Sequence, residues 1–136
     1  MGLAERRAIK DFQDNRYPEL KKQIDGAAGF DVAVEVKWET LAKEGEAHLY
    51  AECLPKVFFQ PLVEALQSVG ADQMGKDALR EGLKKVILRN TAGNYYGDTA
   101  VSFASGELVI DHDPVTNVDD IADRARAIRK ALEKGL

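Results

Sequence analysis

The triplet Asp111-His112-Asp113 contains the side chains best suited to chemistry in this sequence. Carboxylate and imidazole groups are ligands for several divalent metal ions. Successive residues of a strand point to opposite faces, however, so His112 would point away from both carboxylates. The sequence has no His-x-x-x-His or Glu-x-x-His spacing that would supply further ligands, and we predict no metal site. We expect His112 near a strand end on the inner face of a sheet, hydrogen-bonded to Thr99 or to helix backbone.

The other histidine, His48, lies in a stretch where it alternates with Tyr50 and Glu52. A histidine beside a tyrosine and carboxylates has the groups that general-base catalysis requires. On the open face of a sheet, the same residue types usually form solvated cross-strand pairs. We favour this second interpretation, and if the face is covered we expect a second subunit to cover it.

The segment Asn94–Asp98, Asn-Tyr-Tyr-Gly-Asp, is the strongest candidate for a binding loop. Tyrosine offers a large contact area at low entropic cost and ends in a polar hydroxyl. The two rings can line a ligand mouth or a protein interface; alternatively, one ring packs on the core while the other shields a strand end. The residues that we select as candidate ligand or partner contacts are Tyr95, Tyr96, Asp98, His112, His48 and Tyr50.

Known catalytic and cofactor signatures do not occur in the sequence. It has no GxGxxG, GxxxxGK[ST], HExxH, GxSxG or SxxK pattern. The single cysteine, Cys53, excludes an internal disulfide, and its place among alternating apolar residues predicts a buried thiol rather than a nucleophile. We therefore assign no catalytic residue and no cofactor, and the sequence leaves open whether the chain is an enzyme.

Two β-hairpins are predicted to position these residues. In the first, Asp31–Leu54, every second residue up to Trp38 is apolar, which is the period of a half-buried strand. A turn at Glu44-Gly45 would return the chain and place Trp38 on the inner face. The same register puts His48 and Tyr50 on the outer, polar face.

The second hairpin is predicted to turn at Ser105-Gly106. Its inner-face pairs are Phe103 with Leu108, Val101 with Ile110 and Thr99 with His112. Its outer-face pairs are Ala104 with Glu107, Ser102 with Val109 and Ala100 with Asp111. This register separates apolar from polar residues on the two faces.

Four helical segments are predicted around the hairpins. They are residues 3–25 with a break at Pro18, residues 58–69 before Gly70, a helix from the N-cap Asp72 to Asn90, and a last helix capped by Thr116 or Asn117. The last helix has a continuous apolar seam, formed by Val118, Ile121, Ala125, Ile128 and Leu132.

The predicted order is α-β-β-α-α-β-β-α in a single domain of residues 1–136. An isolated hairpin is marginal in water, so two hairpins that each bury one face should share a sheet. We therefore predict an α+β fold, a two-layer sandwich with a four-stranded, mostly antiparallel sheet covered by helices. The pairing order of the two hairpins stays open.

The composition limits the classes of partner. A chain of 136 residues with 45% hydrophobic and 31% charged residues fits one globular domain. Its net charge of −4 argues against binding to nucleic acid or to an anionic membrane surface. The N-terminal residues lack the apolar region of a signal peptide, and no apolar run has membrane-spanning length. We expect a cytoplasmic protein.

These observations favour a small, acidic, non-enzymatic protein-binding or adaptor domain. Its partner would be another protein or a second copy of the chain, and a homodimer is the assembly that we expect. The alternative is a small-ligand-binding protein or enzyme with a pocket between the sheet and the helices, near Asn94–Asp98. The missing signatures and the charged hairpin faces favour the binding domain.

Overall fold

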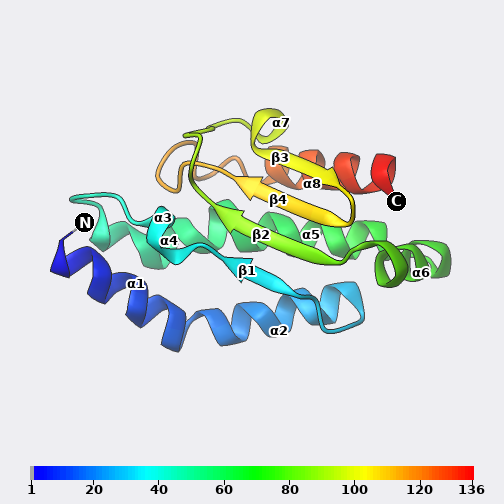
Figure 1. The fold of residues 1–136 in the computed structure, drawn as a ribbon, viewed down its shortest axis with the longest axis horizontal. Helices are drawn as coiled ribbons and strands as arrows, with labels where there is room; N and C mark the ends of the chain where they lie inside the picture. The colour runs from blue at the N-terminus through cyan, green and yellow to red at the C-terminus, as the bar shows by residue number, and fades with distance from the viewer. Residues whose placement is uncertain (1) are drawn as a thin grey trace.

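A computed structural model describes residues 2–136 as one sheet packed on a layer of helices (Figure 1). The strands are β1 (Val34–Val36), β2 (Lys85–Arg89), β3 (Val101–Ala104) and β4 (Glu107–Asp111). The longer helices are α1 (Leu3–Asn15), α2 (Tyr17–Ala28), α5 (Gln60–Val69), α6 (Gln73–Gly82) and α8 (Ile121–Gly135). Shorter helices are α3 (Trp38–Leu41), α4 (Tyr50–Leu54) and α7 (Gly97–Ala100), with a 3-10 turn at Ala47–Leu49 and a π-helical turn at Pro55–Phe59.

The sheet has the strand order β1-β2-β4-β3. β1 pairs with β2 and β2 with β4 in parallel, and only β3 and β4 are antiparallel. The predicted α+β fold with a four-stranded sheet under helices is therefore confirmed, whereas the mostly antiparallel pairing is wrong. Parallel neighbours need a long connection between them. Helices α3 to α6 join β1 to β2, and a loop, α7 and the strand β3 join β2 to β4.

The hairpin at Ser105-Gly106 is confirmed with its predicted register. Val101 lies opposite Ile110, Ser102 opposite Val109, Phe103 opposite Leu108 and Ala104 opposite Glu107. Ser105 and Gly106 have φ values of 53° and 80°, the positive angles of the turn type that matches strand twist. The pairing stops at Val101, because Thr99 and Ala100 belong to α7; the predicted pairs Thr99–His112 and Ala100–Asp111 do not form.

The predicted hairpin over residues 31–54 is wrong beyond Val36. Glu44-Gly45 does form a turn, but the chain on both sides of it is helical. Alanine, leucine and glutamate, which are strong helix formers, dominate residues 46–54. Buried residues then recur at helical spacing, namely Tyr50, Cys53, Leu54, Val57 and Phe58. Trp38 is half-buried and packs edge-on against Tyr17 from α2, at a centroid distance of 5.3 Å.

Pro55 lies inside this helical stretch rather than ending a strand. Proline has no N–H, so the carbonyl four residues earlier loses its helical partner. That carbonyl belongs to Ala51, and the guanidinium of Arg16 donates to it at 3.4 Å. The chain widens into the π-helical turn directly after this point, so the proline is accommodated without a break in the helical path.

Two helix boundaries also differ from prediction. The helix capped by Asp72, whose carboxylate accepts the Gly75 N–H at 2.8 Å, ends at Gly82 instead of Asn90. The run Val86-Ile87-Leu88 forms the centre of β2, since a short apolar run suits a buried parallel strand. The last helix begins at Ile121, and Asn117, with a φ of 52°, cannot belong to a right-handed helix.

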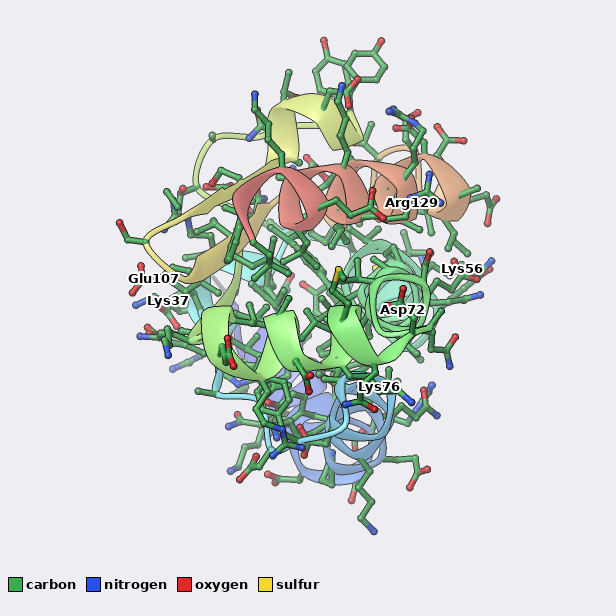
Figure 2. The ribbon with its side chains drawn as sticks, turned by 90° about the vertical axis from the view of Figure 1, so that its right-hand side faces the viewer. Lys37, Lys56, Asp72, Lys76, Glu107 and Arg129 are labelled. Atoms are coloured by element: carbon green, nitrogen blue, oxygen red, sulfur yellow. The ribbon has the colours of Figure 1, made fainter. Side chains whose placement is uncertain are left out.

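The break of the first helix at Pro18 is confirmed, as is the end of α5 at Gly70. α5 lies between α2 and α8, and these helices cover one face of the sheet. That face carries Val86, Leu88, Leu108 and Ile110, all fully buried. Figure 2 shows the two layers from the side, with Lys37 and Glu107 on the sheet side and Lys56 and Arg129 on the helix side. Within residues 2–136, no helix combines the length and apolar character that crossing a lipid bilayer requires.

Candidate functional site

The loops that follow β2 and β4 meet at the carboxyl ends of these two strands, because the strands are parallel and end together. Open sheets of this kind bind ligands outside the carboxyl ends of their strands. The loop after β2, residues 90–96, contains the predicted tyrosine pair, and the loop after β4 contains His112. The carboxyl ends of β2 and β4 are therefore the strongest candidate for a functional site.

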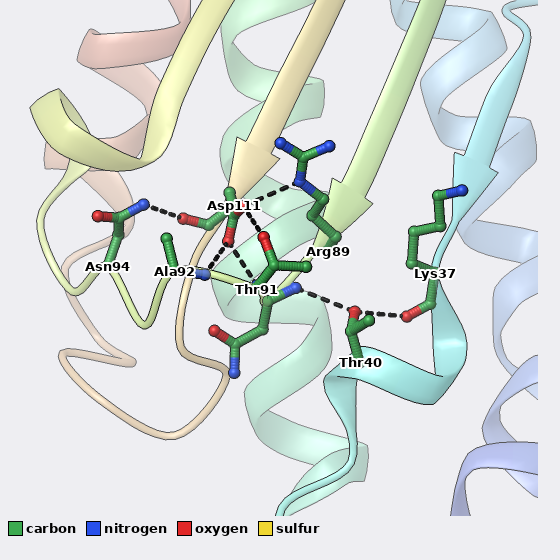
Figure 3. A network of polar contacts seen from close by, with 8 residues as sticks. Lys37, Thr40, Arg89, Thr91, Ala92, Asn94 and Asp111 are labelled. Carbon is green, nitrogen blue, oxygen red and sulfur yellow. Dashed lines mark hydrogen bonds and ion pairs between the residues drawn. The ribbon is translucent and has the colours of Figure 1, made fainter.

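The carboxylate of Asp111, at the end of β4, holds the loop after β2 (Figure 3). Its oxygens accept hydrogen bonds from the Thr91 N–H at 2.8 Å, the Thr91 hydroxyl at 2.5 Å and the Ala92 N–H at 3.2 Å. Arg89 adds an ion pair through Nε at 2.9 Å. Burial by itself would raise the pKa of Asp111, but these hydrogen bonds, led by those of Thr91, outweigh burial and lower it. The carboxylate is thus an anchor for backbone and has little capacity left for a substrate.

A second contact joins the two loops directly. Asn94 Nδ2 donates to the Asp111 carbonyl at 2.9 Å, and the Asn94 carbonyl accepts the Asp113 N–H at 2.7 Å. The Asp113 carboxylate accepts the Val115 N–H at 2.9 Å and pairs with Lys43 at 3.0 Å. Both loops are therefore fixed to each other and to the chain after α3.

His112 lies beneath these loops with no solvent exposure. Its Nδ1 is 2.6 Å from the carbonyl oxygen of Asp113, which can only accept, so Nδ1 carries the proton. This carbonyl replaces the predicted partners, Thr99 and helix backbone. Burial lowers the pKa of His112, and the nearby cation of Arg124 lowers it further. The imidazole is therefore neutral and shielded, which is unsuitable for proton exchange with a solvent-borne substrate.

Tyr95 and Tyr96 are, by contrast, open to solvent. Their side chains are 49% and 58% exposed, and the two ring centroids are 4.6 Å apart. Their backbone is held: the Tyr95 carbonyl accepts from Asn117 Nδ2 at 2.6 Å, and the Tyr96 carbonyl accepts from the Thr99 hydroxyl at 3.1 Å. Neither ring packs on the core, so the structure presents two adjacent aromatic side chains on a fixed loop.

Asp98 follows the tyrosines in the first turn of α7, which lies against α8. The Gly97 N–H donates to Asp123 Oδ2 at 3.3 Å, and a β-carbon at Gly97 would lie only 3.1 Å from the Ala127 side chain. Asp98 is exposed and pairs with Arg126 at 3.3 Å. Glycine at position 97 thus permits the close approach that brings the tyrosine loop onto α8.

A surface hollow of about 480 Å³ continues from α7 along the junction of β3 and α8. We call it the α8 hollow. It is lined by Gly97, Asp98, Val101, Ala127, Lys130, Ala131 and Lys134. Its lysines are exposed, so the hollow is open to solvent and positively charged along its α8 side.

The other two predicted residues lie in another part of the molecule. His48 is exposed on the 3-10 turn, and Tyr50 is buried in α4, a helix that packs against α1. The Tyr50 hydroxyl donates to the Lys43 carbonyl at 3.1 Å and accepts the Lys43 N–H at 2.7 Å. Burial raises the pKa of Tyr50. The expected outer strand face that would carry both residues does not exist, because this segment is helical.

Sequence reasoning missed the residues that fix the loop. The sequence marks Asn94 only as the first residue of the candidate loop and Asn117 only as a possible helix cap, although both have short side chains that readily bond to nearby backbone. Lys130 and Lys134 are four residues apart on α8, a spacing that places them on one helix face. Nothing in their spacing indicates that this face lies beside β3.

Comparison with known proteins finds no family model that matches this chain, no similar curated protein and no similar solved structure. In the described part of the chain, no group of three or more histidine, cysteine, aspartate or glutamate residues is placed to hold a metal ion. The tyrosine loop and its surroundings are therefore the candidate functional site of this chain.

Proposed function

We propose that this chain is a non-enzymatic protein-binding domain and that the loop Asn94–Asp98 is its main contact surface. The observation that carries the proposal is the exposure of Tyr95 and Tyr96 on a loop that hydrogen bonds from three side chains, those of Asn94, Thr99 and Asn117, hold in place. Loops of this kind on a rigid scaffold are the usual place for binding residues.

Exposed aromatic rings gain free energy when an interface removes their apolar surface from water. Tyrosine is among the residues enriched at the energetic centres of protein interfaces. Ordering a loop on binding costs free energy, and a loop that is already ordered avoids that cost. The hydrogen bonds from Asn117 and Thr99 to the tyrosine carbonyls supply this order before a partner arrives.

The polar groups nearby favour binding over catalysis. His112 is neutral and has no access to solvent, and the Asp111 carboxylate is occupied by the loop that it anchors. A small-ligand site usually encloses most of its ligand, whereas the α8 hollow has exposed lysines along one wall. A partner with an extended surface fits this arrangement better than a small molecule does.

Site-specific photocrosslinking in cells that make the protein tests the proposal. A photoreactive phenylalanine analogue is introduced in place of Tyr96 in one variant and in place of Met74 in another. Met74 is 81% exposed on α6 and is a matched exposed apolar site away from the loop. We expect a discrete covalent adduct with another protein from position 96 and none from position 74.

The mass of the adduct separates the two kinds of partner, because a second copy of this chain would double the mass of 15.0 kDa. An adduct that also disappears in a Tyr95→Ala background confirms that both rings take part. Equal labelling from positions 74 and 96, or no protein adduct from position 96, would contradict the proposal.

A further inference from the structure

The strand β3 forms one edge of the sheet and turns some of its backbone groups outward. It pairs with β4 alone, at the end of the order β1-β2-β4-β3. In a hairpin closed by a two-residue turn, the residues next to the turn exchange hydrogen bonds, and the pattern then alternates. Ala104 and Ser102 therefore bond to β4, while the N–H and C=O of Phe103 and the C=O of Val101 point to the free edge.

Apart from its short length of four residues, this edge lacks the features that normally prevent strand addition. Edge strands are usually protected by charged side chains, proline or a bulge. The sequence of β3 is Val-Ser-Phe-Ala, with none of these, and its pairing with β4 is regular. The opposite edge strand, β1, carries Glu35, which forms ion pairs with both Lys37 and Lys85.

The α8 hollow runs beside this free edge and gives it a charge preference. Val101 lines the hollow from the strand side, and Lys130 and Lys134 line it from α8. Among residues 2–136, neither lysine takes part in an ion pair. A strand added at this edge would point every second side chain toward α8, where these two ammonium groups lie.

We propose that the free edge of β3 binds an extended acidic segment of a partner protein, which adds to the sheet as a fifth strand. The inference rests on the proposed protein-binding function and extends it, because the α8 hollow begins at Gly97 and Asp98, directly after Tyr96. Backbone hydrogen bonds to Phe103 and Val101 supply the pairing, and carboxylates at alternate positions meet Lys130 and Lys134. This mode of peptide recognition reuses an exposed sheet edge.

Charge complementarity favours an acidic segment over a second copy of the chain. A two-fold pairing of β3 with its own copy would bring the lysines of both α8 helices toward the same edge, and like charges oppose such a contact. An acidic strand instead neutralises both lysines.

A capped peptide in which glutamate alternates with valine is a suitable probe, added to the full chain labelled with nitrogen-15. We expect amide NMR shifts and slowed hydrogen exchange at Val101–Ala104, with smaller shifts along α8 near Lys130. Two control peptides test the mechanism: one has N-methylated backbone amides, and one has lysine in place of glutamate. Both should fail to produce these changes, because they remove the backbone donors and the charge match, respectively.

The double variant Lys130→Glu with Lys134→Glu should bind the glutamate peptide about tenfold more weakly, as loss of two exposed charge pairs implies. Lys22→Glu, an exposed lysine on α2, is the matched control and should bind like the wild type. The proposal would be overturned if the peptide did not bind, or if it bound the double variant as tightly as the wild type. It would also be overturned if the N-methylated peptide bound equally tightly. Competition by free glutamate at the same concentration as the peptide, which would identify a simple anion site, or a dimer that already protects β3, would overturn it as well.

Failure of this inference is distinguishable from failure of the proposed function. An adduct from position 96 in cells, combined with no response of β3 to the acidic peptide, would retain the binding loop and reject the fifth strand. Shifts at β3 that appear with the peptide while position 96 gives no adduct would reject the tyrosine loop alone.

Discussion

Asn94 donates a hydrogen bond of 2.9 Å from Nδ2 to the carbonyl oxygen of Asp111, and so joins the loop after β2 to the last residue of β4. The next two residues along the chain are the exposed tyrosines. The same Asn94 accepts the Asp113 N–H through its own carbonyl at 2.7 Å. The position of the proposed binding loop is therefore set by contacts made just before it, at the end of the parallel strands.

Replacing Asn94 by alanine should loosen the tyrosine loop. The change removes one partly buried hydrogen bond, which costs about 1 kcal/mol in the free energy of unfolding. We expect faster amide hydrogen exchange at Tyr95–Gly97 and weaker binding of the crosslinked partner. Asn15→Ala is a matched control, because Asn15 makes an exposed side-chain bond to Asp11 at 2.7 Å. Equal effects of the two substitutions on exchange at the loop would contradict the role assigned to Asn94.

Replacing Asp111 by asparagine should cost more than its small change in shape suggests. The side-chain amide of the variant would replace one carboxylate oxygen by an NH₂ group, which cannot accept a hydrogen bond. That group would face the donors that now bind the carboxylate, among them the Thr91 and Ala92 N–H groups and Arg89. We expect a loss of about 2–3 kcal/mol in the free energy of unfolding, measured by urea denaturation near pH 7. Asp14→Asn removes the charge of an exposed pair with Lys10 and should change stability by less than about 1 kcal/mol. A similar small change for both variants would show that Asp111 is not an anchor.

Two helical glycines should respond in opposite directions to alanine. A β-carbon at Gly75 would lie 1.7 Å from the Val69 carbonyl oxygen, whereas one at Gly26 would meet nothing within 4 Å. Gly75→Ala should therefore lower the free energy of unfolding by roughly 3 kcal/mol, as overpacking against backbone does. Gly26→Ala, inside α2, should raise it by about 0.5–1 kcal/mol through helix propensity. Thermal melts of both variants measure these changes, and destabilisation by Gly26→Ala would contradict the open space around that position.

Local signals explain which parts of the fold could be predicted. The β3–β4 hairpin has a turn that demands positive φ angles and strands that alternate cleanly, so its register follows from one short segment, residues 101–110 with the turn in the middle. The pairing of β1 with β2 and of β2 with β4 joins segments that are far apart in the chain. No local pattern specifies such partners. A short run such as Val86-Ile87-Leu88 is also compatible with either a buried strand or a helix.

Part of the candidate site could likewise be predicted from local sequence, and part of it could not. The tyrosine pair can be identified in the sequence because two adjacent tyrosines lie between Asn94 and Gly97, residue types that are typical of loops. The contacts that fix it come from Asp111, Asn117 and Asp123, each at least fifteen residues further along the chain. The expectation that His48 and Tyr50 share the outer face of a strand depended on the first hairpin and is wrong, because that segment is helical.

The buried imidazole of His112 should make the stability of the fold depend on pH. Its pKa is lowered from 6.5 by burial and by Arg124, so the folded protein takes up this proton only at lower pH than the unfolded chain does. Between 6.5 and the folded pKa, the unfolded state binds more protons, and the free energy of unfolding must fall as the pH falls. For one group, the slope is at most about 1.4 kcal/mol per pH unit. The lowered pKa values of Asp111 and Asp113 act in the same direction, but only below their ordinary value of 3.8.

The variant His112→Asn separates this contribution from the rest. Its amide can still donate to the Asp113 carbonyl, but it does not titrate. Between about pH 7 and pH 5, urea denaturation should show a smaller loss of stability for the variant than for the wild type, whatever their difference at pH 7. The ring-proton NMR signals of His112 give an independent measurement and should keep the neutral position below pH 6.5. Parallel stability curves for the two proteins over this range would show that His112 titrates alike in the folded and unfolded chain, and the buried, neutral imidazole described here would then be wrong.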